Sequence, residues 1–114
     1  MDIFQSTSAA SPGVLTLTLK GRLDADGTDK LAGLLAGYID RGERRLVLDL
    51  SQVDYIGSVG LRALMLAAKR LAPLEGRMVL CAPQAPIRHL LDVAGFTSMF
   101  SIVATRHEAA ERML

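Results

Sequence analysis

Strand-like and helix-like apolar patterns alternate along this sequence, and the alternation limits the folds that it can adopt. Residues 14–19 alternate apolar side chains with threonine, which is the two-residue period of a strand with one buried face. From about residue 26 or 28 to residue 40 the apolar side chains recur at helical spacing, and Gly42 follows as a helix stop. Residues 46–50 are almost continuously apolar, which predicts a central strand covered on both faces.

The second half of the chain repeats this order. After a connection at residues 51–57, the pattern predicts a helix from Ser58 to about residue 72, just before Pro73. Ile3 and Phe4 are expected to form a short strand ahead of a turn-like segment at residues 6–13, and Gly21 is expected to end the strand that begins at residue 14. The remaining elements are predicted in the order strand, helix, strand, helix, at residues 77–82, 86–94 (stopped by Gly95), 99–103 and 106–114.

The alternation predicts an α/β fold with four or five strands in a mixed, mostly parallel sheet, helices packed against it, and the first strands antiparallel at one side. With 114 residues, the chain is expected to form one domain over residues 1–114. The predicted core consists of apolar side chains from these strands and helices: Leu17, Leu19, Leu46, Val47, Leu48, Leu50, Leu61, Leu64, Val79, Leu80, Leu90 and Leu91.

Charge and cysteine content weigh against several classes of function. The formal net charge is +1, with 13 basic and 12 acidic residues interspersed, so nothing indicates binding to nucleic acid or insertion into a membrane. The lone Cys81 lies in an apolar run and is expected in the core. His89 and His107 have no Cys or Glu at ligand spacing, so we expect no metal or cofactor.

The first residues lack a signal-peptide pattern and no apolar run reaches the ~20 residues of a membrane span, so a cytoplasmic protein is expected. No glycine-rich phosphate loop, catalytic carboxylate pair or ordered Ser/His/Asp set is visible, and an enzyme is not expected.

Ser58 is the residue that points most clearly to chemistry, because a buried strand leads to it at the predicted start of a helix. Serine is a favoured N-cap, and the free N–H groups at a helix start attract an anion, including a phosphate on Ser58 itself. The plainer interpretation is a helix cap with no further role. Asp24 and Asp26 precede the first helix and allow the same plain interpretation, as N-cap and first-turn acids.

The stretch Gly57-Ser58-Val59-Gly60-Leu61 resembles the signature Asp-Ser-Ser-Gly-Leu or Asp-Ser-Thr-Gly-Leu of the STAS-domain anti-sigma factor antagonists. The likeness extends through Gly21-Arg22-Leu23-Asp24 and residues 46–50, 76–81 and 87–96. Two residues depart from the signature: Gly57 replaces its Asp, and Val59 replaces its second hydroxyl residue.

The resemblance implies a partner-switching protein of transcription regulation. Its unphosphorylated form would bind an anti-sigma factor, a serine kinase of the histidine-kinase-like ATPase type, and release the sigma factor or another target. Phosphorylation at Ser58 would switch binding off. A PP2C-like phosphatase is an additional candidate partner, and the free protein is expected to be a monomer. The residues expected to bind the partner are Asp24, Gly57, Ser58, Val59, Gly60 and Arg62.

Two alternatives stay open. The chain could instead be a regulatory or structural STAS subunit of a lipid- or anion-transport complex, without phosphorylation, and Gly57 is compatible with that reading. It could also bind a nucleotide or another small ligand directly at the helix start of Ser58.

Overall fold

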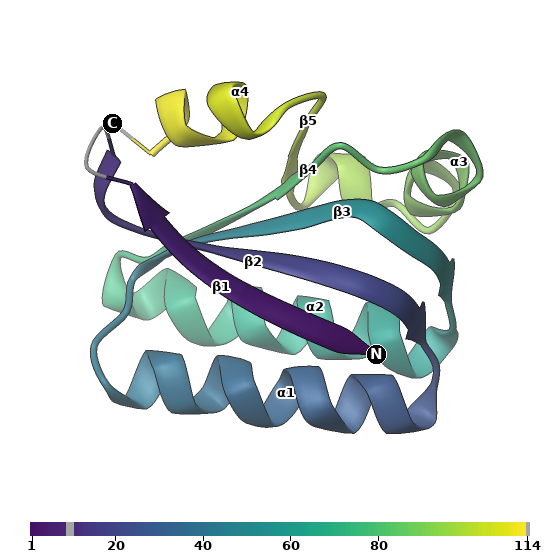
Figure 1. Ribbon diagram of the computed structural model, residues 1–114, viewed down its shortest axis with the longest axis horizontal. Helices are drawn as coiled ribbons and strands as arrows, with labels where there is room; N and C mark the ends of the chain where they lie inside the picture. Colours follow the sequence, from purple (N-terminus) through teal and green to yellow (C-terminus); the bar gives the residue numbers. More distant parts are fainter. Residues whose placement is uncertain (9–10, 114) are drawn as a thin grey trace.

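The computed structural model describes residues 1–8 and 11–113. In this described part of the chain, five strands form one sheet in the order β1-β2-β3-β4-β5 (Figure 1). The first two strands pair antiparallel and every later pair is parallel, which confirms the predicted mixed sheet. The strands are β1 (Asp2–Ser8), β2 (Ser11–Leu23), β3 (Arg45–Ile56), β4 (Arg77–Cys81) and β5 (Ser101–Val103).

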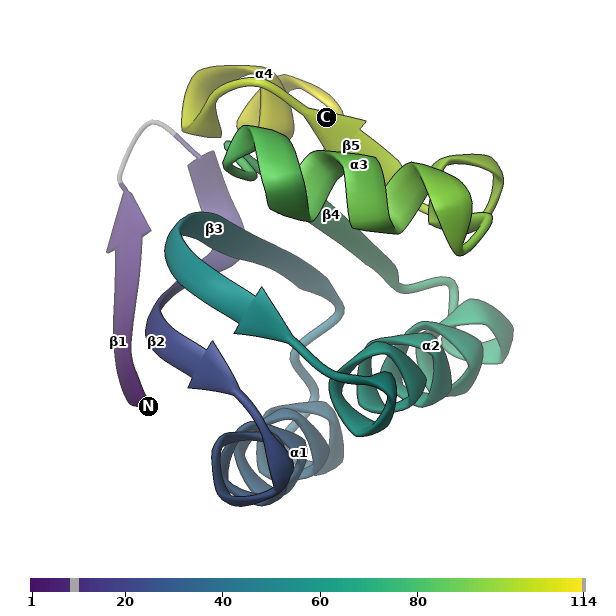
Figure 2. The same cartoon turned by 90° about the vertical axis from the view of Figure 1, so that its right-hand side faces the viewer.

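Helices cover both faces of this sheet. Figure 2 shows α1 and α2 on one side of the sheet and α3 and α4 on the other. None of the helices among the described residues has both the length and the apolar character needed to cross a bilayer. The helices are α1 (Ala25–Asp40), α2 (Ser58–Leu71), α3 (Ala85–Val93) and α4 (Arg106–Glu111), with short 3-10 helices η1 (Ala72–Leu74) and η2 (Phe96–Ser98).

The strands β2 and β3 are longer than predicted, and this corrects two boundaries. Gly21 does not end β2, because its φ of 115° lets the strand continue through an irregular register to Leu23. Residues 51–56 are not a connection, since β3 runs to Ile56 and pairs with the end of β2. Two register shifts, between Thr18 and Lys20 and between Gly21 and Arg22, keep the two long strands together.

Smaller boundary differences have local causes. Most of the predicted turn at residues 6–13 is strand, because β1 runs to Ser8 and β2 starts at Ser11; Ala9 and Ala10 lie outside the described residues. The helix α2 ends at Leu71, before the 3-10 helix η1 with its Pro73. The 3-10 helix η2 delays the last strand to Ser101, and α4 ends at Glu111, with Leu114 outside the described residues.

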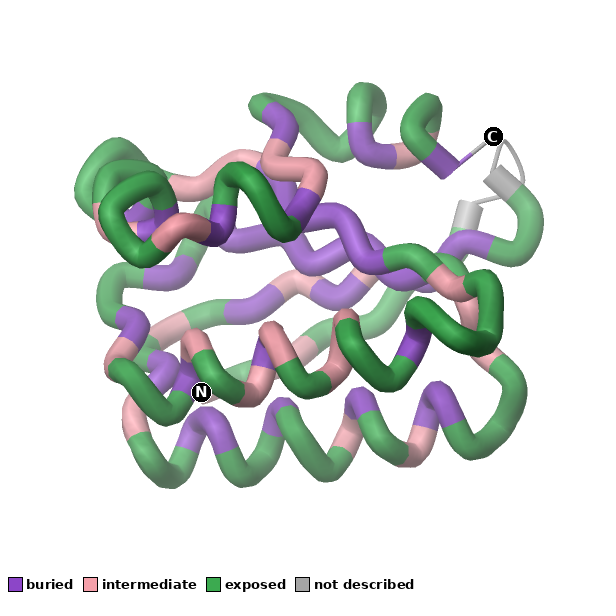
Figure 3. Tube along the Cα trace, turned by 180° about the vertical axis from the view of Figure 1, so that it is seen from behind, coloured by how far each residue is buried: buried purple, intermediate pink, exposed green. Residues whose placement is uncertain are grey.

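The core confirms most of the predicted residues. Leucines at alternate positions of β2 and β3 face α1 and α2, and in Figure 3 the buried segments lie in the strands and on the inner sides of the helices. Leu61 and Leu90 are half-buried rather than buried, since they pack at the margin of this core. A second cluster lies between the other sheet face and α4, and consists of Val14, Val47, Val79, Cys81, Val103, Ala109 and Met113.

One ion pair fastens α4 to the sheet. The buried Asp49 carboxylate accepts hydrogen bonds from Arg106 Nε at 2.6 Å and from the Ser51 backbone N–H at 2.9 Å. Burial alone would raise the pKa of Asp49, but these hydrogen bonds and the Arg106 charge outweigh burial and hold the pKa below its usual value. Burial also raises the pKa of the neighbouring Cys81 thiol to about 11, and the predicted core position of this cysteine is confirmed.

Candidate partner-binding site

Two strand ends meet two helix starts at one edge of the sheet. The last residues of β2 and β3, Leu23 and Ile56, are register partners, and each is followed by one N-cap residue and a helix. The backbone N–H of Gly57 donates to the Leu23 carbonyl at 3.1 Å, which joins the two connections directly. Asp24 and Ser58 are each one residue beyond this bond, so the two residues lie at the same edge, as the parallel sheet predicts. Figure 2 shows β2 and β3 ending side by side where α1 and α2 begin.

The start of α1 is closed by its own side chain. Asp24 is the N-cap, and its carboxylate accepts from the Gly27 N–H at 3.0 Å, while the Thr28 N–H donates to the Asp24 carbonyl at 2.8 Å. Asp26 adds a negative charge to the first turn. The capping role expected for Asp24 is therefore confirmed. The Asp24 side chain nevertheless keeps 48% of its surface exposed.

The start of α2 is open by comparison. Gly57 is the N-cap, with an extended backbone and no side chain to accept a hydrogen bond, and Ser58 is the first helical residue. The interpretation of Ser58 as N-cap was therefore wrong, since the Gly57 carbonyl already accepts the first helical bond, from Leu61 at 3.1 Å. Ser58 is exposed, and the first turn of α2 contains no acidic residue. The positive end of this helix consequently carries no capping carboxylate from its own first turn.

The other predicted site residues divide into surface and supporting positions. Val59 is 49% exposed and Arg62 is exposed, so both are available to a partner from the first turns of α2. Gly60 is buried, and a Cβ there would lie 3.2 Å from the Leu23 carbonyl oxygen and 3.1 Å from the Leu23 Cβ. Gly60 therefore allows the helix to approach the end of β2, and it does not form part of the exposed surface.

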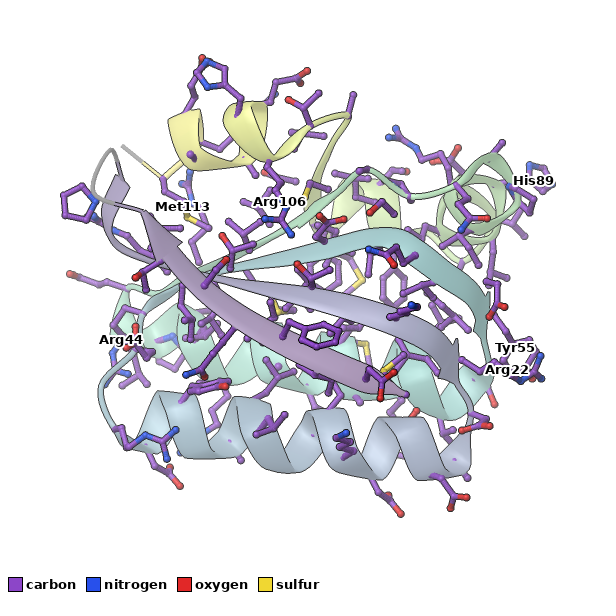
Figure 4. All side chains as sticks on the ribbon, viewed as in Figure 1. Arg22, Arg44, Tyr55, His89, Arg106 and Met113 are labelled. Carbon is purple, nitrogen blue, oxygen red and sulfur yellow. The ribbon has the colours of Figure 1, made fainter. Side chains whose placement is uncertain are left out.

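The sequence analysis missed an Arg–Tyr pair at this edge. Arg22 and Tyr55 are register partners on β2 and β3, and the guanidinium carbon of Arg22 lies 4.2 Å from the centroid of the Tyr55 ring. Figure 4 shows the two labelled side chains next to each other at the edge where α1 and α2 begin. Each residue stands two positions before an N-cap, at Asp24 and Gly57, but the pair itself arises from the register of β2 and β3, for which the sequence held no signal.

The two histidines lie elsewhere. His89 is exposed on α3, and His107 is exposed on α4, where its Nε2 lies 2.8 Å from a Glu111 carboxylate oxygen.

Comparisons with known proteins agree with this arrangement. The STAS domain family profile matches residues 6–109. BtrV of Bordetella bronchiseptica, named as an anti-sigma factor antagonist, is 40% identical over 98 residues, which cover 86% of this chain and 84% of BtrV. The anti-sigma-F factor antagonist RsfB of Mycobacterium tuberculosis is 26% identical over 108 residues, covering 95% of this chain and 88% of RsfB.

A solved structure extends the likeness to the fold. The phosphorylated form of the Bacillus cell fate determinant SpoIIAA superposes with a TM-score of 0.76 at 18% identity, covering 99% of this chain and all of that one. At this identity the likeness concerns the fold alone. The profile match and the identity to BtrV show that the chain belongs to the STAS domain family, among relatives named anti-sigma factor antagonists.

Proposed function

We propose that this protein is an anti-sigma factor antagonist controlled at Ser58. Its unphosphorylated form binds an anti-sigma factor that is also a serine kinase, and thereby releases the sigma factor or another target. The observation that carries the proposal is the exposed Ser58 at the open start of α2, in a chain whose relatives are named for this activity. The phosphorylated form of SpoIIAA, on the same fold, supports the choice of modification.

The chemistry follows from the position of the hydroxyl. The kinase transfers the γ-phosphoryl group of ATP to Ser58 Oγ and releases ADP, and a PP2C-like phosphatase hydrolyses the ester. The phosphate adds a charge of about −1.5 to −2, which a helix N-terminus tolerates. Fold stability therefore changes little, and the main effect of the phosphate is on the partner, through bulk and charge at a surface that the partner must cover.

The proposed contact surface combines residues from both helix starts. Asp24 contributes its exposed carboxylate, and Ser58, Val59 and Arg62 contribute the first turns of α2. Gly57 and Gly60 act indirectly: the Gly57 N–H donates to the Leu23 carbonyl, and the missing side chain of Gly60 lets α2 lie close to the end of β2.

The test is capture of partners from cell extract with wild-type and Ser58→Glu proteins, followed by calorimetry with the purified partner. Ser58→Ala should bind like wild type, and Ser58→Glu should bind at least about tenfold more weakly. Ser98→Glu is the matched control, since Ser98 is an exposed serine in η2, ahead of β5 and hence at the opposite edge of the sheet. Equal affinity of wild type and Ser58→Glu would disprove the switch and would favour the transport-complex alternative.

A further inference from the structure

The Tyr55 side chain of the Arg22–Tyr55 pair lies against Gly57, the position where the family signature has an Asp. A Cβ built on Gly57 would lie 3.1 Å from the Tyr55 hydroxyl oxygen and 3.4 Å from Cε2 of its ring. The Tyr55 ring therefore occupies the space that a side chain at residue 57 would enter. The Cβ to hydroxyl distance is tighter than an ordinary contact, so a side chain at position 57 requires the exposed Tyr55 ring to shift by a few tenths of an ångström.

The local charge beside Ser58 differs from that of the family signature, because the carboxylate directly before the serine is absent. The STAS signature places an Asp directly before the serine, whereas this chain presents a phenol hydroxyl with a guanidinium stacked on its ring. Arg22 keeps 59% of its side-chain surface exposed, and Tyr55 is 40% exposed. Arg22 Nε lies 4.0 Å from a carboxylate oxygen of Asp24, so this contact is long for an ion pair and leaves N–H donors of the guanidinium available.

We propose that the Arg22–Tyr55 stack is a specificity determinant of the partner surface and that it binds a carboxylate of the anti-sigma factor. The inference rests on the proposed function and adds the kind of partner that fits. A guanidinium offers a planar fork of donors that matches a carboxylate, and stacking on Tyr55 holds this fork in place before the partner arrives. Tyrosine and arginine are also the residue types that most often dominate protein interfaces.

The same stack excludes other partners. Some anti-sigma factors would carry a basic group that pairs with the signature Asp of their own antagonist. On this chain such a group would find no carboxylate at residue 57 and would instead face the positive charge of Arg22. Like charges brought together at an interface oppose binding, so the exchange favours the cognate partner over those of related switches.

The chain contains a second Arg–Tyr pair that serves as a matched control. The Arg41 guanidinium carbon lies 5.2 Å from the centroid of the Tyr38 ring, and Arg41 is the C-cap residue of α1. Asp24, beside the first pair, caps the opposite end of the same helix. Tyr38 is buried whereas Tyr55 is 40% exposed, but both arginines are exposed, so either substitution removes one exposed cation from a tyrosine ring. Only Arg22 lies beside Ser58.

The experiment measures affinity for the purified anti-sigma factor recovered with the wild-type protein. We expect Arg22→Glu to weaken binding by at least about tenfold and Arg22→Gln by less, with unchanged melting temperatures. Arg41→Glu should bind like wild type. Binding by Arg22→Gln should also depend less steeply on salt than wild-type binding, because one charge contact is lost.

The outcomes separate this inference from the proposed function. If Arg22→Glu binds as tightly as wild type, or more tightly, while Ser58→Glu binds weakly, the carboxylate-binding role is wrong and the Ser58 switch remains. An equal loss of affinity in Arg41→Glu and Arg22→Glu also overturns the inference, because the effect would not be local. If neither Ser58→Glu nor Arg22→Glu changes affinity, both the inference and the proposed function fail.

Discussion

The starts of α1 and α2 share one design and differ at a single functional point. Each helix follows a strand end and one N-cap residue, and each has glycine three positions after the cap, Gly27 in α1 and Gly60 in α2. In α1 the cap is Asp24, whose carboxylate satisfies a first-turn N–H. In α2 the cap is Gly57, which offers no side-chain acceptor.

This difference separates a helix start that is capped by its own side chain from one that has no side-chain cap. The Asp24 carboxylate and Asp26 offset the positive end of α1 within the chain itself. The first turn of α2 instead presents the hydroxyl of Ser58 with no acidic residue beside it in that turn. A phosphate added there meets a favourable field and no neighbouring negative charge from its own helix, so two similar connections can serve different purposes at one sheet edge.

The largest expected effect tests the glycine that each helix start has three positions after its cap. A Cβ on Gly27 would lie 2.3 Å from the Arg22 carbonyl oxygen, whereas a Cβ on Gly60 would approach its neighbours only to 3.1 Å. Gly27→Ala should therefore cost about 2 to 3 kcal/mol through backbone displacement, and Gly60→Ala about 1 kcal/mol or less. Urea unfolding of both variants measures the difference. Equal costs would show that the two helices do not approach the strand ends as differently as these distances indicate.

The second prediction removes the cap that distinguishes α1. Asp24→Ala should destabilise the protein by about 1 kcal/mol, because the Gly27 N–H loses its acceptor. Asp26→Ala is the matched control, since Asp26 is also a first-turn acid but is not the N-cap, and its cost should stay below about 0.5 kcal/mol. Thermal and urea unfolding give both values. A cost for Asp26→Ala as large as that for Asp24→Ala would mean that general charge, and not capping, stabilises this helix start.

Sequence patterns predicted the strands and helices whose apolar residues recur at one regular spacing, and the strand that is buried on both faces. Residues 46–50 were correctly placed as the central strand, since burial on both sides makes the run apolar without any knowledge of its neighbours. The continuation to Ile56 was missed because its burial follows an exposed, exposed, buried order, which has neither the strand nor the helix period. The register shifts against β2 accompany this order, and a single sequence does not reveal them.

In the candidate site, as in the fold, local features were predictable and contacts between distant segments were not. Capping chemistry correctly predicted the role of Asp24, and the family resemblance pointed to Asp24 and Ser58, both of which lie at the shared edge. The Arg22–Tyr55 stack was not identified, because it depends on the register of two strands whose paired residues are 33 positions apart (55 − 22). Contacts between distant segments arise from tertiary pairing, and local propensity carries no information about them.

The third prediction closes the open helix start. Gly57→Asp would give α2 the cap that α1 has, a gain of about 0.3 kcal/mol because glycine is itself a tolerated N-cap, but its side chain must shift the Tyr55 ring. The gain should therefore appear fully in a Tyr55→Ala background and be reduced or absent in the wild-type background. A double-mutant cycle by urea unfolding should give a coupling free energy of about 0.3 kcal/mol. Additive effects would show that Tyr55 does not occupy the space at residue 57.

A comparably small effect is expected from phosphoserine at position 58. The charge lies at the positive end of α2, where an exposed anion contributes roughly 0.3 to 1 kcal/mol of stabilisation at low salt. The modified protein should melt at the same temperature as the unmodified one or slightly above it, and the difference should shrink as salt is added. Stability changes of this size are small beside a domain stability of about 5 to 15 kcal/mol. Any large loss of partner binding must then arise at the interface.

Ser98 provides the comparison that makes this small effect interpretable. Ser98 is the last residue of η2, and its hydroxyl donates to the Gly95 carbonyl at 2.8 Å, so a phosphate there would break a local hydrogen bond. Phosphoserine at position 98 should lower the melting temperature, whereas phosphoserine at position 58 should not. Calorimetric melting of both modified proteins at low and high salt decides the matter. A collapsed transition for the Ser58 form would mean that phosphorylation acts by unfolding α2, and the open helix start would not be an anion-tolerant one.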